Sequence, residues 1–235
     1  MDSDLIARFI TYLVPMLLSL TVHEYSHALA AWWLGDDTAS MQGRMTLNPI
    51  AHVDPIGTLL VPAIGIMGGF PFIGWAKPVP TNPVRYSRQL AGSRISMTGG
   101  MALVALAGPL SNLLFAAVIV AVMGVVLAIA PESASNKAVW TLPVRMMAVN
   151  VGLALFNMLP LPPLDGSRIL HWMLPSRYQS MMDELGRYTP FLFMGLMFLM
   201  YSDWFQTIFS APFALIIKLL AMAAGIDFVF FYRHM

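Results

Sequence analysis

The sequence predicts an all-α polytopic membrane protein. Hydrophobic residues make up 58% of the 235 residues, charged residues make up only 11%, and the mean hydropathy is +0.70. A soluble domain is typically about 45–50% apolar and about 25% charged. The formal net charge of +1 gives no reason to expect a nucleic-acid partner. The chain has no cysteine, so disulfides, cysteine nucleophiles and thiolate zinc sites are excluded.

Long apolar segments predict about five to six transmembrane helices in a single domain. A spanning helix needs about 20 apolar residues. The acidic start, Met1-Asp2-Ser3-Asp4, lacks the positive charge of a signal peptide, so we expect the first segment to be a retained helix. We expect one membrane-embedded domain over residues 1–235, with a core at about 5–175 and two extra helices at about 189–230. The apolar segments lie at residues 5–34, 56–73, 97–130, 139–159, 191–201 and 208–224.

The region between the first helix and the helix with Gly-Pro-Leu-Ser-Asn predicts a short re-entrant or extended, β-like element. Residues 56–73 are apolar but short, and Gly and Pro interrupt them, so they either span or re-enter the membrane. Such a backbone survives at membrane depth only inside protein or beside a water-filled cavity. The prolines of residues 74–83 favour extended chain. Alternating residues at 39–48, "ASMQGRMTLN", suggest a short hairpin.

The positive charges indicate an orientation in the cell membrane. Cytoplasmic loops carry an excess of Lys and Arg. With the N-terminus outside and residues 56–73 re-entrant, nine of the 13 basic residues fall on the cytoplasmic side. We therefore expect five spans plus a re-entrant element, with six spans as the alternative. The nine are Arg44, Lys77, Arg85, Arg88, Arg94, Arg168, Arg177, Arg187 and Arg233.

Three ionisable residues interrupt the first apolar segment in the pattern "HEYSH". His23 and His27 are four residues apart, which places both on one face of a helix, where they can bind one zinc ion. Glu24 lies beside them and can accept a proton from water without binding the metal. Charged groups at the bilayer centre cost about 2.5–3.5 kcal/mol each on insertion scales and usually mark function. The pattern therefore predicts a zinc hydrolase site.

A third protein ligand is needed, and Asp165 is our candidate. It follows an apolar span in "NMLPLPPLDG", where prolines end the helix and Gly166 frees the backbone. With the N-terminus outside, Asp165 and the two histidines lie toward the cytoplasmic ends of their helices, so their depths match. The alternative is that Asp165 caps a turn leaving the membrane. Other candidates for a place at the metal are His52, Asp54 and His171.

The motifs together resemble the site-2 protease family of intramembrane zinc metalloproteases. They are "HEYSH" at 23–27, "AGPLSN" at 107–112 and "FNMLPLPPLDG" at 156–166, and the similarity covers about residues 15–175. The stretches "RMTLNPIAHVDPIGTLLVP" and "GWAKPVP" resemble a compact prokaryotic branch of the family that has neither a PDZ nor a CBS domain.

This resemblance implies the function and the roles of the site residues. His23, His27 and Asp165 would bind one Zn²⁺, and Glu24 would be the general base. Asn157 would stabilise the substrate carbonyl or oxyanion, and Asn112 would either pack helices together or position the substrate. His52 is a further candidate for positioning the substrate. The implied activity is hydrolysis of a peptide bond within or near a transmembrane segment of a membrane protein substrate, that is, regulated intramembrane proteolysis with the active site toward the cytoplasmic side.

Two alternatives of different kinds stay open from the sequence. A metal transporter or a zinc-stabilised scaffold also carries intramembrane His and Asp, so the chain could be a non-proteolytic membrane metal-binding protein. Neither needs a glutamate directly after the first histidine of the pair. The same zinc site could also hydrolyse a small or lipid-like substrate.

Overall fold

The computed structural model describes residues 3–68, 74–90 and 92–235. Helices dominate the described chain. The long helices are α1 (Ser3–Trp33), α4 (Met97–Ile129), α5 (Lys137–Asn157) and α9 (Asp203–Ala223). The shorter ones are α2 (Thr38–Met41), α3 (Val61–Gly68), α6 (Asp165–Met173), α7 (Ser176–Arg187), α8 (Thr189–Met200) and α10 (Phe228–His234). Among the described residues, α4, α5 and α9 are long and apolar enough to cross a membrane, so the expected polytopic membrane architecture is supported at this coarser level.

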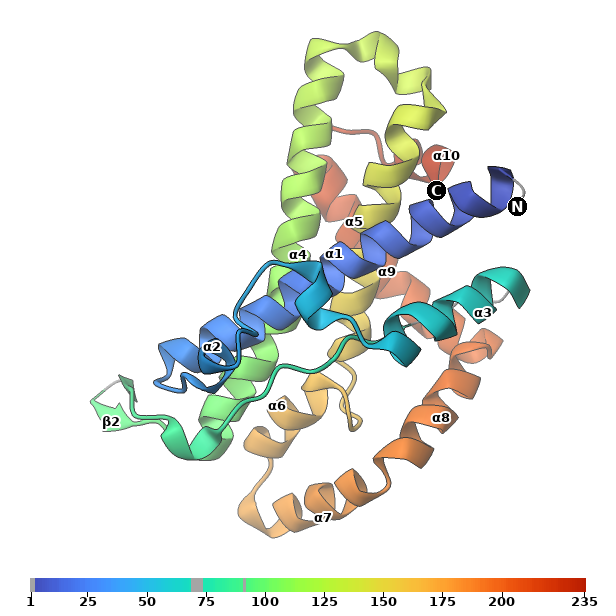
Figure 1. Cartoon of the computed structure of the whole chain (residues 1–235). Coiled ribbons are helices and arrows are strands. Elements are labelled where there is room, and N and C mark those ends of the chain that lie inside the picture. The colour runs from blue at the N-terminus through green and yellow to red at the C-terminus, as the bar shows by residue number, and fades with distance from the viewer. Residues whose placement is uncertain (1–2, 69–73, 91) are drawn as a thin grey trace.

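Helix α4 is the centre of the molecule. It forms an antiparallel hairpin with α5, and α1 crosses this hairpin obliquely, so that the middle of α1 lies against both (Figure 1). Helix α4 also contacts α6. Since α4 touches α1, α5 and α6, it brings the three sequence motifs together, although 142 positions (165 − 23) separate His23 from Asp165.

Three apolar clusters hold these helices. The largest joins α4, α5, α9 and α10 through residues such as Val120, Met147 and Phe231. A second, containing Leu34, Tyr86 and Val104, fixes the end of α1 and the chain before α4 against the first turns of α4. A third, which includes Phe156 and Leu164, joins the end of α5 and the start of α6 to α8 and α9. Helix α10, which the sequence did not predict, completes the first cluster.

The chain between α1 and α4 runs beneath α1 as a mixture of short helices and extended backbone (Figure 1). The expected hairpin at 39–48 is wrong. Asp36 is fully buried and accepts bonds from Thr38 N and Oγ1, which turns the backbone into α2 instead. The two-stranded sheet lies later, where β1 (Gln89–Leu90) pairs antiparallel with β2 (Ser93–Arg94).

The region of the expected re-entrant element begins as helix. A 3-10 turn at Pro49–His52 and a π-helical stretch at Pro55–Leu60 lead into α3, while residues 69–73 lie outside the described chain. Residues 74–82 are extended, as the prolines predicted, and a 3-10 turn at Pro83–Arg85 follows them. We call residues 74–80 the strap, because they pass α1 at Glu24, which accepts a hydrogen bond from Val79 N.

Candidate metal centre and active site

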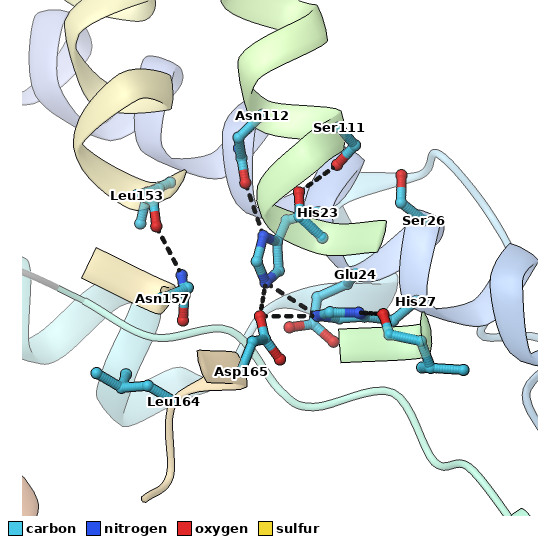
Figure 2. A network of polar contacts seen from close by, with 12 residues as sticks. His23, Glu24, Ser26, His27, Ser111, Asn112, Leu153, Asn157, Leu164 and Asp165 are labelled. Carbon is cyan, nitrogen blue, oxygen red and sulfur yellow. Dashed lines mark hydrogen bonds and ion pairs between the residues drawn. The ribbon is translucent and has the colours of Figure 1, made fainter. Parts of the chain in front are cut away.

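His23, His27 and Asp165 meet at one point (Figure 2). The two histidine Nε2 atoms are 3.0 Å apart, and Asp165 Oδ2 lies 3.1 Å from the first and 3.3 Å from the second. The side chains are 5%, 12% and 15% exposed, so water is largely excluded from all three. These residues are the group of His, Asp and Glu side chains in the described chain whose ligand atoms converge closely enough for one metal ion.

The His23 ring is oriented by Asn112 on α4. Its Nδ1 lies 2.6 Å from Asn112 Oδ1, and this oxygen can only accept, so Nδ1 carries the proton. The Asn112 amide orientation is fixed in turn, because its Nδ2 donates to Ser19 O and to Asn150 Oδ1 at 2.8 Å. Asn112 and Asn150 are both fully buried. Nε2 is therefore the ring nitrogen that His23 directs at the cluster.

His27 is held in the same tautomer by a backbone group. Its Nδ1 lies 2.7 Å from the Val104 carbonyl oxygen, which can only accept, so Nδ1 carries a proton and Nε2 is the nitrogen directed at the cluster. Asp165 Oδ2 is buried without a hydrogen-bond partner. Two imidazole nitrogens and one carboxylate oxygen thus converge on one point, an arrangement that suits a bound cation.

The donor set fits zinc. Tetrahedral zinc with bonds of about 2.0–2.1 Å to imidazole nitrogen places neighbouring ligand atoms roughly 3.3 Å apart, close to the 3.0–3.3 Å found here. Two nitrogens and one carboxylate oxygen are also the ligand types of catalytic zinc sites, which keep a fourth position for water or substrate. A histidine that binds a metal usually donates its other ring N–H to an oxygen acceptor, and this hydrogen bond fixes the orientation of the ring.

The local sequence explains how Asp165 reaches the histidines. Helix α5 ends at Asn157, and a turn with three prolines leads to α6, whose first residue is Asp165. The N-cap of α6 makes no side-chain bond, and Asp165 points at the histidines, so the capping alternative is wrong. A Cβ on Gly166 would run into the backbone carbonyls of Met158 and Leu159. Only glycine lets α6 begin this close to the end of α5.

Gly108 allows α4 to approach the two histidines closely, a role that the sequence analysis did not predict. A Cβ at this position would lie 2.5 Å from a ring carbon of each histidine and 2.6 Å from His27 Nε2. Val104, Gly108 and Asn112 are spaced by four residues, so they share one face of α4. That face contacts the His23–His27 face of α1. The spacing was visible in the sequence, but the carbonyl of Val104 carries no side-chain signal, and neither does the distant Asn150.

Glu24 lies beside the cluster and makes its own contact. Figure 2 shows its carboxylate near the three ligands without an ion pair to them. It is 9% exposed, and its Oε2 accepts a hydrogen bond of 2.8 Å from the backbone N–H of Val79 in the strap. The carboxylate therefore keeps one oxygen tied to the strap.

The other residues that the sequence suggested for the site are not part of the converging group of metal ligands and make separate contacts. Asn157 donates from Nδ2 to Leu153 O within α5, 3.0 Å away (Figure 2). His52 is buried, and its Nε2 lies 2.8 Å from Thr46 O. Asp54 caps the helix after it by accepting from Ile56 N and Gly57 N. His171 faces Asp183 at 3.3 Å.

Comparisons with known proteins agree with this arrangement. Over 192 residues, or 78% of both chains, the sequence is 36% identical to Putative zinc metalloprotease YwhC of Bacillus subtilis. The profile of Peptidase family M50 matches residues 120–201, which include Asp165. The chain belongs to peptidase family M50. This peptidase is also 31% identical over 159 residues to Putative zinc metalloprotease Rip2 of Mycolicibacterium smegmatis, a match that covers 67% of the chain and 55% of that relative. No solved structure matches it.

Substitution of Gly108 by alanine will abolish stable zinc binding. The new methyl group overlaps both imidazole rings, and Asn112 and Val104 prevent the rings from moving aside. Zinc per purified chain measures the effect. Gly152→Ala is the matched control, because a Cβ there meets nothing closer than 4.0 Å. Full zinc content in Gly108→Ala would contradict the described packing.

Asn112→Leu will weaken zinc binding by about 10–100-fold, the usual effect of losing a group that orients a metal-bound histidine. Competition with a chelator of known affinity gives the value. Ser111→Ala is the control, since the Ser111 hydroxyl contacts only backbone oxygens, Gly108 O at 2.7 Å and Val22 O at 3.5 Å. Equal affinities of the two variants would show that the His23–Asn112 bond does not support the metal.

Proposed function

We propose that this zinc metalloprotease is an intramembrane endopeptidase. It hydrolyses a peptide bond within or near a transmembrane segment of a membrane protein substrate, in regulated intramembrane proteolysis. The observation that carries the proposal is the convergence of His23, His27 and Asp165 beside Glu24, on helices packed around the membrane-length helix α4. A metal site built into such helices is placed to meet substrates that are themselves in the bilayer.

Each site residue has a role in this proposal. His23, His27 and Asp165 hold one zinc ion, with their tautomers and positions set by Asn112, Val104 and the turn before α6. Zinc bound there would supply Lewis acidity, which polarises a carbonyl and lowers the pKa of water. Glu24 accepts the proton of the attacking water and returns it to the leaving amine. Its Oε2 is bonded to the strap, so Oε1 is the oxygen that exchanges the proton.

Asn157 is the proposed donor to the developing oxyanion, an effect worth up to a few kcal/mol. Its Nδ2 bonds Leu153 O, one turn earlier in α5. In this role, the amide exchanges that intrahelical acceptor for the substrate oxygen. Leu153 O lies in the helix, where it remains bonded as an ordinary backbone acceptor.

The substrate helix must unwind before a peptide bond reaches the site, because its amides are otherwise paired internally. The strap offers an edge for the unwound peptide. Alternate residues of an extended chain face opposite edges, and Trp75, Lys77 and Val79 bond the protein through their N–H groups. The opposite edge has one N–H, that of Ala76, because Pro78 and Pro80 have none. Pairing is therefore short.

We also propose the membrane arrangement that the charges predicted. The protein lies in the cell membrane as one domain with five spans plus a re-entrant element at 56–73, with six spans as the alternative. The active site then opens toward the cytoplasm.

A transporter or scaffold role is not favoured by any observation. Neither role uses a glutamate carboxylate held beside the metal ligands by a backbone N–H. A small or lipid-like substrate is separated from a protein substrate by assay against a panel of single-span peptides.

Glu24→Gln will retain zinc and lose cleavage of transmembrane peptides by at least about 10²-fold, because the amide cannot accept the proton. His23→Ala and Asp165→Ala will lose both zinc and cleavage. Metal content and peptide cleavage are measured on the same purified samples. Cleavage at the wild-type rate by Glu24→Gln would remove Glu24 from the mechanism.

The membrane orientation is testable because the chain has no cysteine of its own. Ser180→Cys on α7 and Ser135→Cys between α4 and α5 both introduce exposed thiols. An impermeant thiol reagent will reach position 180 from the cytoplasm and position 135 from outside. The reverse pattern would invert the proposed topology.

A further inference from the structure

The strap presents a single backbone donor to the proposed general base. In Pro78-Val79-Pro80 only Val79 has an N–H, because both neighbours are prolines. That N–H donates to Glu24 Oε2 at 2.8 Å. A bond to an ionised carboxylate is roughly twice as strong as one between neutral groups, and Glu24 is almost entirely buried. The contact is therefore shielded from competing water.

The backbone just before Val79 is fastened by a buried arginine. Arg44, 9% exposed, donates from one guanidinium nitrogen to Lys77 O at 2.7 Å and to Pro78 O at 3.4 Å. The backbone N–H of Lys77 is held as well, because it donates to His52 O at 2.9 Å. Three backbone atoms just before Val79 are thus held by hydrogen bonds: Lys77 N, Lys77 O and Pro78 O. Pro80 further restricts Val79 to extended backbone, so its N–H has little freedom to turn away.

The start of the strap is also fixed. Trp75 N donates to Gly57 O at 3.2 Å, and Trp75 O accepts from Thr58 Oγ1 at 2.7 Å. Thr58 is 1% exposed. A surface connector needs none of these buried ties. The strap is instead built as a rigid support whose free donor points at Glu24, the design expected of a group that orients a reacting side chain.

We propose that the Val79 N–H, held by Arg44, is a positioning group for Glu24. The proposal rests on the general-base role of Glu24 given above. By fixing Oε2, the N–H sets the plane of the carboxylate and leaves Oε1 directed at the attacking water. Without it, the carboxylate rotates about its last bond, and misplacement by about 1 Å can cost about 100-fold in rate. Val79 and Arg44 act through Glu24 and do not touch the reacting atoms.

Val79→Pro tests the proposal, since it removes the N–H from a segment that already has proline on both sides of this position. Val79→Ala truncates the same side chain and keeps the N–H. With zinc-loaded full-length enzyme and a transmembrane peptide, we expect kcat of Val79→Pro to be about 10–100-fold below that of Val79→Ala, with similar KM and zinc content. Equal kcat values would overturn the proposal. A faster Val79→Pro enzyme would also overturn it, because the contact would then be an inhibitory latch.

Arg44 provides the second pair of variants in case Val79→Pro does not retain zinc. Arg44→Met removes the donors to Lys77 O and Pro78 O, while Arg44→Lys can restore one of them. We expect Arg44→Met to lower kcat several-fold at unchanged zinc content and Arg44→Lys to recover part of the loss. Unchanged kcat in Arg44→Met, or no recovery in Arg44→Lys, would contradict the positioning role.

Hydrogen exchange separates failure of this inference from failure of the proposed function. Val79 has the only backbone amide N–H within Pro78–Pro80, and its exchange is followed at residue resolution by NMR. Glu24→Ala removes the acceptor, and we expect at least about 10-fold faster exchange at Val79. Unchanged exchange would overturn the contact itself. Faster exchange in Glu24→Ala would show that the contact exists. If the wild type then cleaves no peptide, the proposed function fails, and the positioning role is refuted with it.

Discussion

Two imidazole nitrogens and one carboxylate oxygen lie 3.0–3.3 Å apart, each with its lone pair directed at the same point. In a membrane-embedded protein, this arrangement is costly without a cation, because burying unpaired charged and polar groups removes their hydration. The rest of the site serves to maintain it. Asn112 and Val104 fix the protons on the far sides of the rings, and the turn before α6 delivers the carboxylate.

Helix α4 combines two tasks that usually fall to different elements. Its residues at 104, 108 and 112 form one face that both contacts α1 and orients the metal-binding rings. Gly108 provides the close approach, and the groups one turn away on either side provide the hydrogen bonds. Helix α4 also packs against α5, which supplies Asn150 to complete the buried amide network of Asn112. Packing and metal binding therefore depend on the same few positions.

The sequence predicted the parts of this site that reside in side-chain chemistry. His23 and His27 followed from their spacing, and Asp165 followed from a carboxylate placed after an apolar span and several prolines. The long helices were also found, because hydrophobic length is a strong signal. The hairpin at 39–48 was wrong, since alternation there carried no information about the buried Asp36 that starts α2. The contacts of Val104 and Val79 could not be predicted, because they use backbone atoms whose partners are distant in sequence.

The proposed site holds one zinc ion between two histidines and one aspartate. X-ray absorption spectroscopy at the zinc edge of the purified protein tests it most directly. We expect one zinc per chain, with two imidazole nitrogens and the remaining ligands oxygen at about 2.0–2.2 Å, and a change in the oxygen shell when Asp165 is replaced. Zinc with a single imidazole, or a spectrum unchanged in Asp165→Ala, would contradict it.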